Sequence, residues 1–465
     1  LNLTSATAGT ATNVGAPAAV QLFNNMESAL GNGGELTAAY NDVGLTWTIG
    51  TDLGNTNVDG FAFDDFSILT SGIGDDLFTV LSGNTDVLTV NASAGADTFD
   101  VQANTLADLL GQEGNDTFAV REGITSNKLD GGAGIDSLAA LGDAGTDNTW
   151  TITGPDAGTL DQGTGPLQAF AGLEGLQGDG SADTFVFVGG GSTSGGIDGG
   201  AGINLLDYTG TLGAVTVNLN DATATNVGTT FASITGLIGN GANSQLIGLD
   251  AGSTWTIGAD ITDSNADGFA FDNVATLTGG TGVDTFNVIA NNIDVLIADG
   301  GAGNDLFNIQ ANSSATLSGG AGADTFAVQE GFSSNSIDGG ADLDALAALG
   351  NAGTDNTWTI TGVNAGSLDQ GTGPTQAFAG LESLLGNGDN DTFVFSGGSM
   401  EGSVAGGAGA NLLSYVGTVG AVTVNLNNAT ATNVGTTFAS ITGMIGNGEQ
   451  SQLIGLDAGS TWTIG

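Results

Sequence analysis

The stretch Leu277-Thr278-Gly279-Gly280-Thr281-Gly282-Val283-Asp284-Thr285-Phe286-Asn287-Val288 carries the pattern that organises the whole chain. Its glycines permit backbone conformations with positive φ, which residues with a Cβ resist, so Gly-Gly-x-Gly predicts a tight turn. The residues that follow alternate between polar and apolar, which is typical of a half-buried strand. The pattern therefore predicts a turn that carries a carboxylate and leads into a strand whose Phe points inward.

Copies of this pattern recur along the chain. Complete copies place an acid at Asp136, Asp284, Asp305 and Asp324. Near-copies, with Phe or Leu two residues after the acid, place it at Asp76, Asp97, Asp116, Asp183, Asp344 and Asp391. One Gly-rich Asp turn is weak evidence, whereas ten copies in phase indicate a repeat architecture.

The acids within a run lie 19 to 21 residues apart, and each interval reads as two short strands and two turns. Each interval thus predicts one coil of a parallel solenoid, stacked about 4.8 Å from the next coil. We expect an all-β, parallel β-helix or β-roll of about 22 coils, each of about 20–21 residues. The side chains predicted to form one internal ladder are Phe78, Phe99, Phe118 and Leu138.

A longer period is superimposed on the coils, because Thr-Trp-Thr-Ile-Gly occurs at 46–50, 254–258 and 461–465. We therefore divide the chain into 1–50, the end of a preceding repeat, and two repeats of about 208 residues, 51–258 and 259–465. Related Trp segments split these repeats into halves, at about 51–153 and 154–258, then 259–361 and 362–465. This arrangement predicts a section of a longer tandem array.

Three local features complete this prediction. Segments 145–164 and 353–372 interrupt the turn spacing and predict coils that bulge at Pro155, Pro166 and Pro374. The five Trp residues are predicted to face inward or to cover such coils, and stacking against sugars is the alternative. Residues 18–30, which follow a Pro, are predicted to form a short helix.

The charge excludes some partners. The chain has 50 acids against one Lys and one Arg, for a net charge of −48, so its surface repels nucleic acid and anionic membranes and attracts cations. The acids are mostly Asp, which favours turn and ligand positions over a generic salt-adapted surface, although salt adaptation stays open. No apolar run approaches the roughly 20 residues that span a bilayer, so we predict no membrane insertion.

Catalytic chemistry has few candidates in this composition. His and Cys are absent from the sequence, which excludes the usual nucleophile–base pairs, zinc sites and disulfides. Paired carboxylates such as Asp75 with Asp76, or Asp389 with Asp391, could in principle cleave sugars. A pattern repeated in every coil does not suit a single active site, so we predict that the protein is not an enzyme.

The Gly-Gly-x-Gly-x-Asp turns resemble those of the RTX (repeats-in-toxin, haemolysin-type calcium-binding) proteins. In that family the turns stack, and Ca²⁺ lies between one turn and the equivalent turn of the next coil. The ion prefers 6–8 oxygen ligands, more than one small turn presents. The resemblance implies Ca²⁺ as cofactor, a secreted bacterial protein at the cell surface or outside the cell, and metal ligands at Asp76, Asp97, Asp116, Asp136, Asp183, Asp284, Asp305, Asp324, Asp344 and Asp391.

The sequence departs from the family pattern in its spacing. The family repeats the motif back to back, whereas here one motif per 19–21 residues implies a single metal-binding edge. Neutral residues replace the acid in related turns at Asn204, Asn411, Ser244 and Ser451. The sites at Asp183 and Asp391, which precede the two Asn turns, are therefore expected to be weaker or empty, and Ser181 and Asp342 replace turn glycines.

The alternative to calcium is that each Asp caps its own turn without a metal. Stacked carboxylates about 5 Å apart would repel by about 1 kcal/mol per pair even in water, and a divalent ion would reverse that sign. On this argument we favour calcium, whose binding would couple folding to the calcium found outside cells.

Two functions of different classes follow. The favoured one is a calcium-stabilised structural rod in an extracellular filament, sheath or matrix, which self-associates end to end or laterally. The alternative is the stalk, or the glycan- or cell-binding module, of a large adhesin. A ligand site should break the repetition, and the two repeats differ mostly by conservative changes. That similarity favours the structural role.

Overall fold

The computed structural model describes residues 2–3, 8–11, 21–24, 28–38, 44–81, 83–142, 145–350, 353–448, 451–461 and 463. These residues form strands throughout and no helix, which confirms the all-β prediction. Within this described part, no helix is long and apolar enough to cross a membrane. The chain divides into two units, Leu1–Val215 with Asp221–Asn240 and Thr216–Asn220 with Gly241–Gly465.

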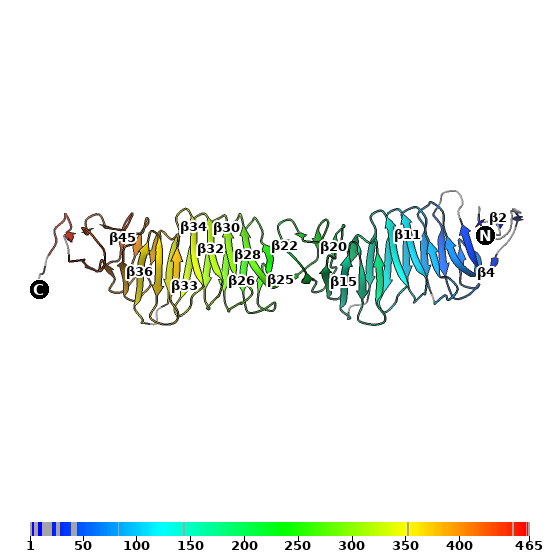
Figure 1. The fold of residues 1–465 in the computed structure, drawn as a ribbon, viewed down its shortest axis with the longest axis horizontal. Helices are drawn as coiled ribbons and strands as arrows, with labels where there is room; N and C mark the ends of the chain where they lie inside the picture. Colours follow the sequence, from blue (N-terminus) through cyan, green and yellow to red (C-terminus); the bar gives the residue numbers. More distant parts are fainter. Residues whose placement is uncertain are drawn as a thin grey trace. The chain divides into compact units, whose positions relative to one another are not determined.

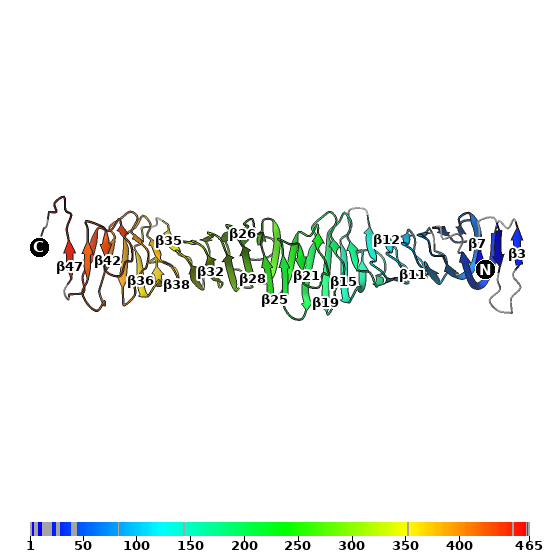
Figure 2. The same cartoon turned by 90° about the horizontal axis from the view of Figure 1, so that it is seen from above.

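Each unit is a parallel solenoid in which strands of successive coils pair in rows (Figures 1 and 2). In unit 1 the first row is β5 (Thr46–Ile49), β8 (Leu77–Val80), β10 (Thr98–Val101), β12 (Thr117–Arg121), β14 (Ser137–Leu141), β18 (Gly175–Gln177), β20 (Ile197–Asp198) and β24 (Phe231–Ala232). The second row is β4 (Ser28–Ala38), β7 (Phe61–Thr70), β9 (Thr89–Asn91), β11 (Asp108–Glu113), β13 (Lys128–Ala133) and β17 (Gln168–Ala171). A third row is β15 (Asn148–Gly154), β19 (Asp183–Gly189), β21 (Leu205–Thr211) and β25 (Gly236–Ile247).

Unit 2 repeats these rows. Its first row is β26 (Thr254–Ile257), β29 (Thr285–Val288), β31 (Leu306–Ile309), β33 (Thr325–Gln329), β35 (Ala345–Leu349), β39 (Ser383–Leu385), β41 (Val404–Ala405) and β45 (Phe438–Ala439). Its second row is β28 (Phe269–Gly280), β30 (Ile297–Gly301), β32 (Thr316–Ala321), β34 (Ser336–Ala341) and β38 (Gln376–Ala379). Its third row is β36 (Asn356–Gly362), β40 (Asp391–Phe395), β42 (Leu412–Ser414) and β46 (Gly443–Ile445).

The remaining strands are short or pair antiparallel with the rows. They are β1 (Asn2–Leu3), β2 (Ala8–Ala11), β3 (Gln21–Asn24), β6 (Asn57–Val58), β16 (Ala157–Asp161), β22 (Val215–Asn218), β23 (Thr223–Ala224), β27 (Asn265–Ala266), β37 (Ala365–Asp369), β43 (Thr423–Asn425), β44 (Thr430–Ala431) and β47 (Gln452–Ile454).

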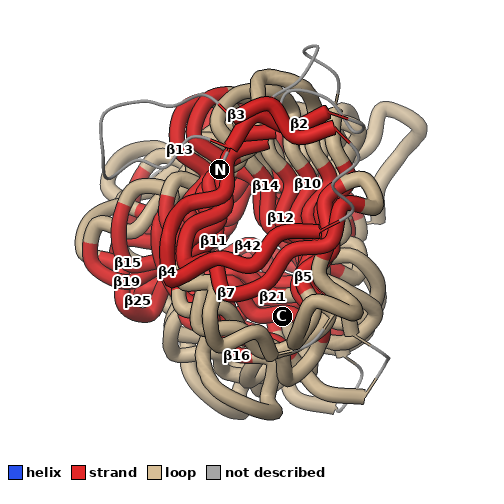
Figure 3. The backbone as a smooth tube through the Cα atoms, turned by 90° about the vertical axis from the view of Figure 1, so that its right-hand side faces the viewer, coloured by secondary structure: helices blue, strands red, loops and turns tan. Residues whose placement is uncertain are grey.

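An aromatic ladder fills the interior of the first row. Phe78, Phe99 and Phe118 pair in register with one another and then with Leu138, as predicted. Their rings stack with centroid distances of 4.8 and 4.5 Å, which is close to the separation of neighbouring strands. Viewed end-on, β10, β12 and β14 lie behind one another (Figure 3). The strand spacing thus brings identical side chains into contact without any adjustment of the backbone.

The tryptophans face the interior. Trp47, Trp150, Trp255 and Trp358 are fully buried, which confirms the inward prediction for these four, while Trp462 lies outside the described residues. Trp255 stacks on Phe286 with centroids 5.4 Å apart and so begins the aromatic ladder of unit 2. The four buried indole rings have no surface on which a sugar could stack.

The segments predicted to bulge at the prolines contain inserted hairpins. In unit 1, β15 and β16 form an antiparallel hairpin through Pro155 and Asp156, and β16 pairs antiparallel with β17. Asp156 turns the chain with φ 51°, a conformation that Asp and Asn tolerate. Unit 2 builds the same hairpin from β36 and β37, with Asn364 at φ 54°.

The helix predicted over 18–30 is also wrong wherever the structure describes it. Residues 21–24 form β3, which pairs antiparallel with β2, and residues 28–30 begin β4, which pairs parallel with β7. The rest of that segment lies outside the described residues. Pairing with neighbouring strands overrides the local helical tendency.

The aromatic ladder makes a quantitative prediction. Phe99→Ala removes a fully buried ring that stacks on two others, so we expect it to lower the free energy of unfolding by about 3–5 kcal/mol. Leu106→Ala is the control, because Leu106 is 64 % exposed, and we expect a change below about 0.5 kcal/mol. Urea unfolding followed by circular dichroism measures both. Equal losses in the two variants would contradict the ladder as a source of stability.

Candidate functional site: a ladder of buried aspartates

The repeated turn joins a second-row strand to a first-row strand of the same coil. In the complete copy at Gly131, the first three residues end β13, and the turn that follows places Asp136 immediately before β14. Gly132 and Gly134 take φ values of 103° and 153°, which confirms the predicted glycine turn. Because strand residues alternate in direction, Asp136 and Leu138 both point into the solenoid.

All ten predicted aspartates are buried, each with at most 2 % of its surface exposed. The structure brings eight of them together in two series, one in each unit. The series of unit 1 is Asp76, Asp97, Asp116 and Asp136, and that of unit 2 is Asp284, Asp305, Asp324 and Asp344. We call these eight residues the ladder aspartates.

Each ladder aspartate binds the backbone of the preceding coil. The main-chain N–H of Asp76 donates to Oδ1 of Asp97 at 2.7 Å, and that of Asp97 donates to Oδ1 of Asp116 at 2.8 Å. In unit 2, Asp305 N–H donates to Oδ1 of Asp324 at 2.7 Å. These bonds join neighbouring coils, so Oδ1 does not cap its own turn as the metal-free alternative supposed.

Two glutamates that sequence reasoning missed extend the series. Asp136 N–H donates to Oε2 of Glu174 at 2.6 Å, and Asp344 N–H donates to Oε2 of Glu382 at 2.8 Å. A signal was present, since Leu176 and Leu384 follow these acids by two residues, as Phe or Leu follows each motif Asp. The inserted hairpin places each Glu 38 residues after the preceding ladder aspartate. In the sequence, this longer spacing hides the equivalence of the Glu to the motif aspartates.

Asp183 and Asp391 lie in the third row and have different surroundings. Oδ1 of Asp183 accepts hydrogen bonds from Asn148 Nδ2 at 3.0 Å and Trp150 Nε1 at 2.9 Å, and its Oδ2 accepts the N–H of Asp179 at 3.2 Å. Asp391 has the same arrangement with Asn356, Trp358 and Asn387. Both carboxylate oxygens therefore have donors.

The ladder aspartates differ in their second oxygen, because Oδ2 of all eight is buried without a hydrogen-bond donor. Burial is the largest cause of a raised pKa at each of them. The pKa rises to about 7 at Asp97 and Asp324, and to about 6 at Asp136, Asp284 and Asp344. Desolvation disfavours the charged carboxylate. Backbone hydrogen bonds to the ladder carboxyls lower the pKa in part, and side-chain hydrogen bonds from Ser71 and Trp255 do so at Asp76 and Asp284.

The ladder offers Ca²⁺ few carboxylate oxygens, although carbonyl oxygens lie beside them, as Gly131 O and Asp116 Oδ2 do around the position of a Cβ on Gly111. Each coil offers one carboxylate oxygen, Oδ2, because Oδ1 already accepts a main-chain N–H. The described residues contain no group of three or more His, Cys, Asp or Glu that could hold a metal. Exposure of 2 % or less leaves little access for the waters that would complete 6–8 oxygen ligands. Calcium at the ten aspartates stays a prediction of the resemblance.

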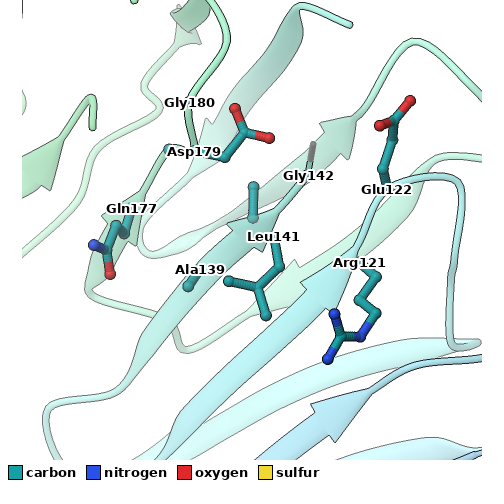
Figure 4. A pocket seen from close by; sticks show the side chains of 10 residues that line it. Arg121, Glu122, Ala139, Leu141, Gly142, Gln177, Asp179 and Gly180 are labelled. Atoms are coloured by element: carbon teal, nitrogen blue, oxygen red, sulfur yellow. The ribbon is translucent and has the colours of Figure 1, made fainter. Parts of the chain in front are cut away.

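A separate hollow lies on the surface of unit 1 (Figure 4). Its lining includes Arg121, Glu122, Leu141, Gln177 and Asp179. In unit 2 Gln329 and Asn387 align with Arg121 and Asp179, whereas Glu330 aligns with Glu122, so the charged lining is repeated only in part. None of the ladder aspartates lines this hollow, and we assign it no role.

Comparison with known proteins adds no family. No protein-family model matches the chain, and no curated protein matches its sequence significantly. The similarity to RTX repeats therefore rests on the turn motif alone and stays a prediction. The fold and the ladder carry the functional argument.

The first glycine of the motif generates a prediction. A Cβ on Gly131 would clash with the carboxylate of Asp136 and with the carbonyl oxygen of Gly172 in the next coil. We expect Gly131→Ala to lower the free energy of unfolding by about 1–3 kcal/mol, as other overpacked sites do. Gly190→Ala is the control, because a Cβ there meets no atom within 4 Å. Thermal unfolding of both variants tests this, and a neutral Gly131→Ala would contradict the close packing.

The missed glutamate generates another prediction. Glu174→Ala leaves the buried N–H of Asp136 without its acceptor, so we expect a loss of about 1–3 kcal/mol in unfolding free energy. Glu174→Gln keeps a side-chain oxygen at the same reach, and we expect it to retain most of the stability. Urea titrations of the two variants measure the difference. If Gln is as damaging as Ala, the side chain acts through its charge instead.

Proposed function

We propose that this chain is a structural repeat module of an extracellular filament, sheath or matrix. The observation that carries the proposal is the recurrence of the same contacts between coils in both units. Phe78 pairs with Phe99 in unit 1, and Phe286 pairs with Phe307 at the equivalent place in unit 2. A chain of this kind extends by adding coils, because each coil contacts mainly its neighbours.

The charge determines how such modules could associate. A net charge of −48 with two basic residues makes two copies repel strongly at neutral pH and low salt. Salt shortens the range of that repulsion to about 10 Å at 0.1 M ionic strength. We therefore expect self-association, end to end or lateral, under conditions in which the acids are screened by salt or neutralised.

The adhesin alternative has less support. Aromatic side chains that stack on sugars must be exposed, and Trp47, Trp150, Trp255 and Trp358 are fully buried. The polar hollow at Arg121 changes its charged lining between the units, whereas the buried ladders repeat. Repetition of the interior supports a structural role over a single ligand site.

Electron microscopy with sedimentation velocity tests the structural proposal. We expect the purified chain to be dispersed at low salt and pH 8, and to form regular fibres or bundles as ionic strength rises, because screening removes the repulsion. Circular dichroism in the same samples checks that the strands persist. Dispersed monomers under all conditions, together with selective binding to a glycan array, would overturn the proposal in favour of the adhesin.

A further inference from the structure

One face of each unit carries no net charge, although the chain as a whole has a charge of −48. This face consists of the outward side chains of neighbouring first-row strands, and we call it the first-row face. Its strands are β5, β8, β10, β12, β14 and β18 in unit 1, and β26, β29, β31, β33, β35 and β39 in unit 2. Inward and outward residues alternate along each strand, so the two sets are distinct.

In unit 2 every outward residue of these strands is uncharged, and all are Thr, Ser, Asn, Gln, Ala or Leu. In β31, for example, Leu306 and Asn308 point outward, and the residues that alternate with them are buried. The second row of the same unit differs, because its outward residues include Asp272, Asp299 and Asp338. The lack of charge is therefore a property of this face and not of the coils in general.

Unit 1 reaches the same neutrality with an ion pair. The charged outward residues of its six strands are Asp100 and Arg121, and Arg121 Nη2 lies 3.8 Å from Asp100 Oδ1. In unit 2 the equivalent residues are Asn308 and Gln329, so both members of the pair are replaced by neutral residues. The single arginine of the sequence thus compensates the acid on this face. The neutral stretch of unit 1 ends at β20, whose outward residue is Asp198.

The outward side chains are small enough for another sheet to approach. Ala119 in β12 pairs with Ala139 in β14, and unit 2 has Ala327 and Ala347 at the equivalent places. Leu141 at the end of β14 is 39 % exposed, and its equivalent in unit 2 is 40 % exposed, so both units offer the same apolar contact. Sheets that pack face to face lie about 10 Å apart, with side chains of the two faces interdigitating.

We propose that the first-row face is the surface through which two copies of this chain pack against each other, sheet on sheet. This inference rests on the structural role proposed above and assigns a surface to the lateral association. The charge favours a second copy as the partner, because its first-row face is equally neutral. Contact through the second-row faces would instead bring acids of both copies together. A two-fold axis would place the same face of each copy in the contact.

The area of the face determines how many units must pair. Six strands about 4.8 Å apart, each with about four residues that rise about 3.3 Å, cover about 400 Å². Two facing units would therefore bury about 800 Å² in all, which is less than the roughly 1,200 Å² of a stable, specific interface. Each further unit that pairs adds the same area, so we expect tandem repetition to strengthen the association.

The two basic residues of the chain provide matched variants. Arg121→Gln leaves Asp100 without its partner on the first-row face, whereas Lys128→Gln removes the same charge from β13 in the second row. We expect Arg121→Gln to raise the protein concentration at which the chain associates by about tenfold or more at fixed salt, because the contact would bury an unpaired charge. Lys128→Gln should match the parent chain. Sedimentation velocity measures association, and circular dichroism checks that each variant is folded.

A double variant distinguishes the loss of the ion pair from the loss of a charge. Arg121→Gln combined with Asp100→Asn gives unit 1 the neutral residues that unit 2 has at these places, and we expect association to return to that of the parent. If the two single variants behave alike, or if the double variant does not recover, then the first-row face is not the contact and the proposal fails.

An introduced thiol reports the buried surface directly, because the sequence contains no Cys. Ala347→Cys places a thiol on the first-row face, and Thr316→Cys places one on the second row, in β32. We expect a maleimide to react with both thiols in dispersed samples and, after association, only with that of Thr316→Cys. Equal reactivity of the two thiols in the associated state would overturn the proposal.

The results separate this inference from the structural role itself. If the parent chain associates and the Arg121→Gln variant associates equally well, the assigned face is wrong and the structural role stands. If the parent chain stays monomeric at every salt concentration, the structural role and the pairing of first-row faces fail together.

Discussion

Burial of one carboxyl group in every ladder coil is the constraint on which the rest of these coils depends. Neighbouring coils are separated by one strand spacing, so the buried carboxyl group can bond only to groups of the adjacent coils. It accepts the main-chain N–H of the preceding coil, as Asp116 does from Asp97. The first glycine of the turn must lack a side chain, because a Cβ on Gly111 would occupy the position of the carboxylate. The motif therefore combines a glycine with an acid because the carboxylate fills the space that a side chain at the glycine would need.

The same bond also fixes the register of the interior. A slip of one residue would turn Phe99 and Val101 out to solvent and bring polar side chains into the core. The ladder aspartate immediately precedes a first-row strand. Its hydrogen bond to the preceding coil holds that strand in the register in which Phe stacks on Phe. Polar and aromatic ladders therefore run side by side, and each keeps the other in alignment. The third row uses another solution, in which Trp150 and Asn148 supply the donors for Asp183.

The acidity of the chain determines the conditions under which modules could associate. The formal charge of −48 counts every acid as ionised, and the ten motif aspartates among these acids are buried. Acids at the surface are screened by salt. In a fibrous role, a saline environment would therefore favour association of the modules.

Local pattern determined much of this protein from sequence alone. Gly-Gly-x-Gly-x-Asp-x-Phe predicted the turn, the buried strand and the Phe ladder, because backbone freedom at Gly and alternation along a strand act within a few residues. Its recurrence every 19–21 residues predicted the solenoid and the stacking of Asp76 on Asp97. What only the tertiary structure decided lies between coils. Three features depend on distant backbone: the hairpin of β15 and β16, the bond from Asp136 N–H to Glu174, 38 residues further on, and the bond from Asp97 N–H to Asp116 Oδ1. A calcium turn and a metal-free turn need the same acid among the same glycines, so the sequence could not separate them.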